Sequence, residues 1–277
     1  MRTLTILLAA LAIAPAATAQ TPPPAESTIP HDGEAEVIAR FKAEANQGVA
    51  VDAAYLYGVS NSKIVKYDKK TGAKLATWQG EKARFPHINS CEVIEAKLIC
   101  AASNFSQVPQ QSSVEVFDPK TMTHEKTIAL GQGIGSLTWV DRKDGFWWAT
   151  FANYDGKGGE PGRDHRYTLF VKFDDQWRRT ESWTFPANVL ERFAPMSSSG
   201  GGWGPDGLLY ITGHDHPELY VLKLPKGGPT LDYVATIGVA TEGQAIAWDK
   251  TQPRVVYGIS RAGGEVIGMK IPEVAKK

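Results

Sequence analysis

Hydrophobic and polar residues alternate along most of the chain in short segments that polar turns interrupt. Between Ser197 and Pro225, residues 207–212 alternate around a tyrosine and branched aliphatic side chains, residues 213–218 are polar, and residues 219–224 alternate again. A period of two is typical of β-strands, so this stretch predicts a strand, a loop and a strand. Helical periodicity is nearly absent, and only residues 188–193 predict a short helix.

One sequence motif, an acidic residue followed by a short turn and a strand, occurs five times along the chain. The acidic residues lie 43, 46, 65 and 43 residues apart, and they are Asp52, Glu95, Asp141, Asp206 and Asp249. Repeats of about 40 to 50 residues suit the four-stranded blades of a β-propeller, and a glycine-rich insertion at residues 153–166 accounts for the longest spacing. The pattern therefore predicts an all-β, five-bladed β-propeller. An open β-sandwich is the alternative, but sandwiches do not normally repeat one motif five times.

The end of the repeat predicts how the ring closes. The first blade predicts four strands, at residues 48–51, 55–59, 63–67 and 74–78. The fifth unit supplies a third strand at residues 265–271 but no fourth, whereas the strand-like segment at residues 34–43 precedes the first blade without a partner. We expect this N-terminal strand to complete the fifth blade, because that closes the ring and removes an exposed edge.

Composition and charge narrow the class of protein. The chain has 277 residues, 42% of them hydrophobic, and 30 basic residues balance 30 acidic ones. We therefore expect one globular domain over residues 34–277. The balanced charge argues against nucleic acid or an anionic membrane surface as a partner. The sequence gives no indication of the oligomeric state.

The N-terminal residues predict export. Residues 1–19 contain Arg2, an apolar run and the small residues Ala17-Thr18-Ala19, which is the plan of a cleavable signal peptide. A membrane anchor that stays uncleaved is the alternative, although the apolar run is short for one. Residues 20–33, rich in proline and polar residues, predict a disordered linker. We expect a periplasmic or secreted protein with no membrane insertion after cleavage.

The two cysteines, Cys91 and Cys100, fall on consecutive predicted strands with Glu95 and Ala96 at the turn between them. Residues placed symmetrically about a hairpin turn face each other within reach of a disulfide. In an oxidising compartment this favours a cross-strand disulfide over two free thiols, and over a metal site with two sulfur ligands.

If each blade meanders outward from the axis, the loops that join second to third strands share a face with the loops between blades. We call this the loop face and the opposite one the turn face, and we expect function on the former. The predicted loops of the loop face are residues 60–62, 80–86, 103–113, 131–135, 153–168, 186–202, 213–218, 239–243 and 260–264.

Four of the six histidines fall on the loop face. His87 and Asn89 open the inner strand of blade two and should point toward the axis, and other candidates are His214 and His216 of blade four and the pair Asp164 and His165 of blade three. Neutral imidazole is a good ligand for transition metals, so His214 and His216 predict a divalent metal site, with Asn89, Asp164 and His165 as ligand-binding residues. The alternative is that these side chains hydrogen-bond loop backbones.

Glu242 and Arg261 predict a further part of the site in blade five. Arg261 can bind a carboxylate through two hydrogen bonds, and a Glu242 side chain desolvated near the axis can act as a general base. We therefore take Glu242 and His87 as candidate catalytic residues, while a surface ion pair between Glu242 and Arg261 is the alternative. Trp203 is predicted to start an inner strand, where it would either stack on a ligand or pack in the core.

Residues 47–75, with the sequence QGVAVDAAYLYGVSNSKIVKYDKKTGAKL, resemble one blade of the plant-type glutaminyl cyclotransferases. That resemblance implies cyclisation of an N-terminal glutamine, and it places no catalytic residue. The chain as a whole resembles a secreted bacterial family of five-bladed propellers with no assigned activity. We expect the axial funnel to bind a small polar molecule, with metal-assisted hydrolysis or cyclisation as its chemistry. A non-catalytic scaffold that binds a protein or a glycan is the alternative.

Overall fold

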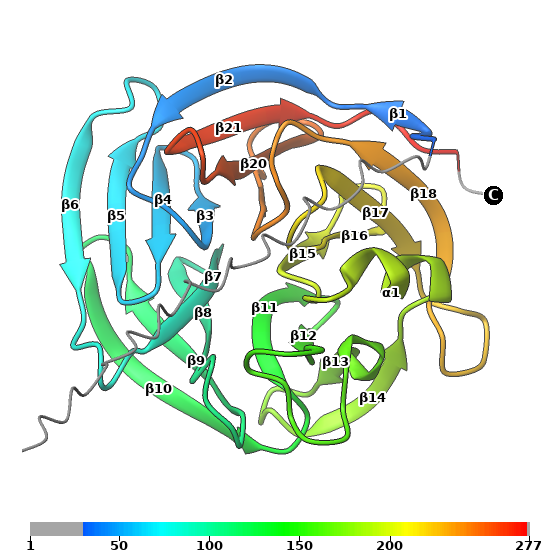
Figure 1. Ribbon diagram of the computed structural model, residues 1–277. Helices are drawn as coiled ribbons and strands as arrows, with labels where there is room; N and C mark the ends of the chain where they lie inside the picture. The colour runs from blue at the N-terminus through cyan, green and yellow to red at the C-terminus, as the bar shows by residue number, and fades with distance from the viewer. Residues whose placement is uncertain (1–29, 276–277) are drawn as a thin grey trace, which may run out of the picture.

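The computed structural model describes residues 30–275, so the predicted signal peptide lies outside the described residues. Five antiparallel sheets surround a central axis and form a five-bladed β-propeller (Figure 1). The predicted fold class is confirmed. Among residues 30–275, no helix has the length and apolar character needed to cross a membrane.

Each of the first four blades is built from consecutive strands that run outward from the axis. Blade one comprises β3 (Gly48–Val51), β4 (Tyr55–Ser60), β5 (Lys63–Asp68) and β6 (Lys74–Gln79). Blade two comprises β7 (His87–Ile94), β8 (Lys97–Ser103), β9 (Gln111–Asp118) and β10 (Thr123–Gln132). Blade three comprises β11 (Ser136–Lys143), β12 (Phe146–Ala152), β13 (Leu169–Phe173) and β14 (Arg179–Thr184). Blade four comprises β15 (Gly200–Trp203), β16 (Leu209–Thr212), β17 (Glu218–Lys223) and β18 (Asp232–Gly238).

Blade five is completed from the other end of the described chain, as predicted. Its inner strands are β19 (Ala247–Trp248), β20 (Val255–Ser260) and β21 (Glu265–Lys270), and the outer strand β2 (Glu36–Lys42) pairs antiparallel with β21. Figure 1 shows β2 in blue along the outside of β21 in red. The short strand β1 (Gly33–Glu34) was not predicted, and it extends blade four by pairing parallel to β18. Its first residue, Gly33, is the last residue of the stretch predicted as a linker.

The repeated acidic residues join elements at the turn face. Asp52 and Asp206 each accept a hydrogen bond from a tyrosine hydroxyl of the next strand, Tyr57 and Tyr210 respectively, at 2.7 Å. Arg254 of blade five donates to Asp206 of blade four at 2.9 Å. Polar side chains with low exposure need such partners, so the motif that reveals the repeat also joins neighbouring blades.

The blades pack through apolar clusters that include several tryptophans. Trp139, Trp183 and Trp248 are buried at 1%, 9% and 7% exposure, whereas the half-buried Trp147 stacks on Trp177. The cysteines are paired in register between β7 and β8, and the predicted Cys91–Cys100 disulfide is confirmed. The predicted helix is α1 (Ala187–Phe193), which lies between blades three and four, and a 3-10 turn, η1 (His165–Tyr167), occupies the insertion of blade three.

Candidate functional site

A small polar cavity lies on the axis at the loop face, and every blade contributes to it. Each blade contributes at least one lining residue that lies on its inner strand or shortly before it. From blade one to blade five these residues are Gln47, His87, Thr138, Ser199 and Gln244. The cavity has a volume of about 70 Å³. This is well below the range of about 300 to 1,000 Å³ typical of small-molecule sites, so the space takes part of a ligand rather than a whole one.

His87 and Asn89 project into this cavity as predicted. The imidazole of His87 is only 9% exposed and lies 5.1 Å from the ring of Phe105, centroid to centroid. Burial lowers the pKa of His87 to about 4, the hydrogen bond with Asn89 opposes that shift, and His214 adds to it. Asn89 is fixed in turn because its amide donates to the Leu137 carbonyl at 2.6 Å. His87 is therefore neutral at pH 7, which makes it a hydrogen-bonding group and a weak base.

Gln244 is one of the cavity residues that were not predicted from the sequence. Its backbone has a φ of +71°, in the left-handed region that side chains other than glycine seldom adopt. Two hydrogen bonds hold it there, since Thr212 Oγ1 donates to its carbonyl at 2.6 Å and its amide donates to the Gly213 carbonyl at 3.2 Å. The residue is 3% exposed, yet its side-chain Nε2 is buried without a hydrogen-bond partner. Gln244 thus combines a left-handed backbone with a buried side-chain donor that has no partner within the described residues.

His214 and Arg261 meet at the mouth of the cavity. His214 lines the cavity, its Nδ1 lies 2.6 Å from Asp215 Oδ1, and its Nε2 lies 3.4 Å from Arg261 Nη1. The hydrogen bond from His214 is the main cause that lowers the pKa of Asp215. Glu242 is not among the residues that line the cavity, and its Oε1 accepts a hydrogen bond from Ser260 at 3.1 Å. Among the described ion pairs none joins Glu242 to Arg261, because the guanidinium lies against His214 instead.

The predicted metal ligands lie close to cations. His214 faces the guanidinium of Arg261, and burial together with Arg192 lowers the pKa of His216. Each guanidinium opposes a divalent ion at the neighbouring imidazole, whereas Asp215 beside His214 and Glu218, which pairs with Arg192, favour one. Within residues 30–275 a different group brings three ligand atoms within 4.8 Å of one another, namely Asp155, Asp164 and His165.

That group is already paired within itself and with a neighbour. His165 Nδ1 lies 2.5 Å from Asp155 Oδ1, and Arg166 donates two hydrogen bonds of 3.0 Å to the Asp164 carboxylate. The bond from Arg166 lowers the pKa of Asp164 to about 2. Asp164 also caps η1 by accepting from the Arg166 amide. Asp164 and His165 thus lie on the loop face as predicted but not among the residues that line the axial cavity.

The position predicted for Trp203 is wrong. Trp203 ends β15 rather than starting it, so it lies toward the turn face, where its ring packs 5.1 Å from Trp148 and its amide donates to Asp141 at 2.8 Å. The glycine run at residues 200–202 forms the strand itself, because Gly201 packs directly against Trp139. The aromatic side chain therefore contributes to packing between blades three and four.

A second set of ionisable residues occupies the inner strands near the turn face. Burial raises the pKa of Glu92 to about 7, while Lys250, at 2.9 Å, opposes that shift and Asp141 adds to it. Burial also raises the pKa of Asp141. Lys250 belongs to blade five and Glu92 to blade two, so the pair spans the axis. In the sequence, Asp141 stands out only as part of the repeat, and no pattern indicates a role for Glu92.

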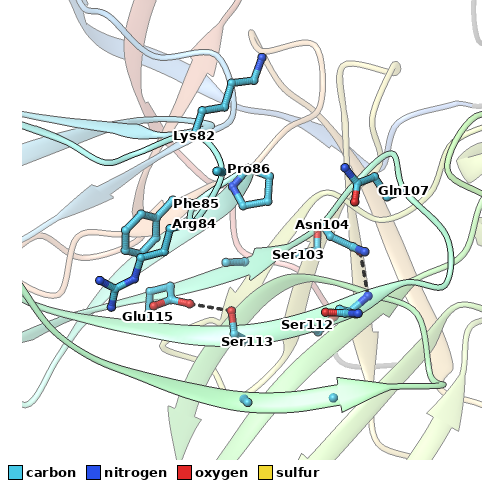
Figure 2. Close-up of a pocket in the computed structure, with 15 residues that line it drawn as sticks. Lys82, Arg84, Phe85, Pro86, Ser103, Asn104, Gln107, Ser112, Ser113 and Glu115 are labelled. Carbon is cyan, nitrogen blue, oxygen red and sulfur yellow. Dashed lines mark hydrogen bonds between the residues drawn. The ribbon is translucent and has the colours of Figure 1, made fainter.

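The largest cavity described in the structure is not axial. It has a volume of about 680 Å³ and lies over blade two, between the loop at residues 80–86 and the loop at residues 103–113 (Figure 2). Both loops belong to the predicted loop face. Ser103 connects the two sites, because it lines the larger cavity while its hydroxyl accepts a hydrogen bond from Asn89 at 3.2 Å.

Comparisons with known proteins name no family for this chain. No model of a known protein family matches it, and no curated protein sequence matches it. Among solved structures, it is similar to a PQQ-bound aldose sugar dehydrogenase from Streptomyces coelicolor, at 13% identity over 89% of this chain and 84% of that one, with a TM-score of 0.49. It is also similar to the hydrazine synthase of Kuenenia stuttgartiensis, at 12% identity over 78% and 68% of the two chains, with a TM-score of 0.45. The Cps50 (Swd1) β-propeller domain of Myceliophteria thermophila matches at 10% identity over 84% and 85%, with a TM-score of 0.45. None of these likenesses bears on what the chain binds or does.

Proposed function

We propose that this protein is an exported β-propeller that binds a small polar molecule on its axis at the loop face. The observation that carries the proposal is the buried, unpaired amide nitrogen of Gln244 beside the neutral imidazole of His87. A buried donor without a partner costs about 1 to 3 kcal/mol, which a ligand that supplies an acceptor recovers. The ligand inserts one uncharged acceptor group, such as a carbonyl or hydroxyl oxygen, into the cavity of about 70 Å³.

The rest of the ligand lies at the mouth, where His214 and Arg261 are available. Arg261 is exposed and contacts His214 at 3.4 Å, so it can bind a carboxylate or another anionic group of the ligand. The low pKa of His87 favours a binding role over general-base catalysis at neutral pH. The cyclisation implied by the resemblance of residues 47–75 gives one specific reaction to assay, with glutamine-initiated peptides as substrates.

The proposed export is supported by the Cys91–Cys100 disulfide, because disulfides form and persist mainly in oxidising compartments. The proposed divalent metal is tested separately, by metal analysis of protein purified without chelator or metal-affinity resin. A stoichiometric ion that His214→Ala releases would support the metal; an ion that the variant retains would place it elsewhere.

Binding is tested by thermal-shift screening of small polar metabolites, followed by calorimetric titration of each hit. Gln244→Leu removes the unpaired donor at similar volume, so it should weaken binding at least tenfold while leaving stability unchanged or raised. Gln132→Leu, at the exposed end of β10, is the matched control and should bind as the wild type does. If Gln244→Leu binds every hit as tightly as the wild type, the axial site is refuted.

The second candidate function is a non-catalytic scaffold that binds a protein or a glycan. The observation that favours it is the cavity of about 680 Å³ over blade two, which is large enough for a ligand that the axial cavity excludes.

A further inference from the structure

The groove over blade two has the size and position of a binding site. We define it as the cavity between the loop at residues 80–86 and strands β8, β9 and β10, and its volume is about 680 Å³. Small-molecule sites range from about 300 to 1,000 Å³. The groove is separate from the axis, since it shares no lining residue with the axial cavity.

One wall carries two cations without counterions. Lys82 and Arg84 are both exposed, and neither takes part in an ion pair with any residue from 30 to 275. The guanidinium carbon of Arg84 lies 5.1 Å from the ring centroid of Phe85, which holds the Arg84 side chain against the loop. Figure 2 shows Lys82 and Arg84 on the loop side of the groove, with their charged ends pointing in different directions. Two unpaired cations beside a concave surface attract an anion.

The opposite wall offers uncharged hydrogen-bonding groups. Gln107 and Gln111 are exposed, and their side chains make no hydrogen bond within the described chain. The loop that carries them is held in shape by Asn104, which accepts from the Gln111 amide at 2.8 Å and donates to the Pro109 carbonyl at 3.0 Å. Figure 2 shows Asn104 and Gln107 across the groove from Lys82 and Arg84. Carboxamides donate and accept together, which suits the hydroxyl groups of a sugar.

The floor of the groove contains one carboxylate, Glu115, which is buried and hydrogen-bonded. Glu115 is 3% exposed and accepts hydrogen bonds from Ser113 at 2.6 Å and from Thr127 at 2.6 Å, and it lies 2.8 Å from His124 Nε2. Glu81, the acidic neighbour of Lys82, is not among the residues that line the groove. Burial and these hydrogen bonds reduce the repulsion between Glu115 and an anion in the groove.

We propose that this groove binds an anionic sugar, with its carboxylate or phosphate at one of the two cations, Lys82 or Arg84, and its hydroxyl groups at Gln107 and Gln111. A neutral glycan fits less well, because the one aromatic ring at the groove, Phe85, is only 6% exposed and offers no stacking surface. A long polyanion also fits less well, because the chain has no net charge. The site is independent of the axial proposal and stands if that proposal fails.

The test is calorimetric titration of the full mature protein with glucuronate and with glucose 6-phosphate, which separate the two sources of negative charge. Glucose and inorganic phosphate are the matched probes that lack the charge and the sugar respectively. We expect at least one anionic sugar to bind at least tenfold more tightly than both matched probes. The double variant Lys82→Ala/Arg84→Ala should reduce that binding at least tenfold, and higher salt should weaken it.

Lys226→Ala/Arg179→Ala is the matched control, because it also removes two exposed cations, from blades three and four. It should bind as the wild type does. Circular dichroism confirms that each variant is folded, and Gln107→Ala gives a second readout that leaves the charge unchanged. The proposal would be overturned if glucose or inorganic phosphate bound as tightly as the anionic sugars. It would also be overturned if Lys82→Ala/Arg84→Ala kept the affinity of the wild type for them. The proposal would also be overturned if neither glucuronate nor glucose 6-phosphate binds at a concentration of about 10 mM.

Discussion

The buried Glu92 makes a prediction about stability with a distinctive pH dependence. Burial raises its pKa from the ordinary value of 4.5 to about 7, although Lys250 lies 2.9 Å away and favours the charged form. The folded protein therefore binds a proton that the unfolded chain releases, so stability falls as the pH rises from about 4.5 to about 7. A shift of this size corresponds to about 3 kcal/mol, because each pKa unit is worth about 1.4 kcal/mol.

Glu92→Gln removes the charge while keeping the shape of the side chain. Relative to the wild type, the variant should gain about 2 to 3 kcal/mol of unfolding free energy between pH 5 and pH 8. Lys250 tolerates the loss of its partner, because its side chain is 60% exposed to water. The assay is urea unfolding of both proteins at pH 5 and pH 8, followed by tryptophan fluorescence.

Glu191→Gln, at an exposed position of α1, is the control and should change stability by less than about 0.5 kcal/mol at both pH values. The reasoning is refuted if Glu92→Gln loses more stability at pH 8 than at pH 5. That result would mean that attraction between Glu92 and Lys250 outweighs the burial of the carboxylate.

Two further predictions concern closure of the ring and the disulfide. Deleting residues 20–44 removes β1 and β2 and leaves β21 as an unpaired edge. The melting temperature measured by differential scanning calorimetry should therefore fall by roughly 5 °C or more. An unchanged melting temperature would contradict closure of the ring by β2. Mass spectrometry without reductant should find Cys91 linked to Cys100 in exported protein, with no alkylatable thiol. Replacing both cysteines with serine should lower the unfolding free energy by about 2 to 3 kcal/mol, and equal stability in urea would show that the cross-link contributes nothing.

Much of the fold follows from local sequence because each blade repeats the same local rules. Period-two alternation marks the strands, and the recurrent acidic residues stand at the turns, where Asp52 and Asp206 each hold a tyrosine of the next strand. The edge left unpaired at residues 265–271 required a partner, and the segment at residues 34–43 was the strand available. The disulfide followed from hairpin register alone.

The candidate site was predicted only in part. His87, Asn89 and His214 do line one axial cavity, because the start of β7 and the loop between β16 and β17 both lie on the loop face near the axis. Gln244 was missed because a left-handed backbone and an unpaired amide leave no mark on the sequence. Trp203 was placed at the wrong end of its strand, because a run of glycines does not show where a strand begins.

By itself, then, the sequence determined the fold class, the number of blades, the closing strand and the disulfide, all of which depend on residues close in the chain or on strand periodicity. The tertiary structure decided which side chains meet across the axis and how burial changes their chemistry. Lys250 lies 2.9 Å from Glu92, 158 residues away in the chain, and no local pattern records that contact. The neutral state of His87 and the raised pKa of Glu92 likewise arise from desolvation by several blades at once. Desolvation and pairing are properties of the assembled ring, so only the folded chain could reveal them.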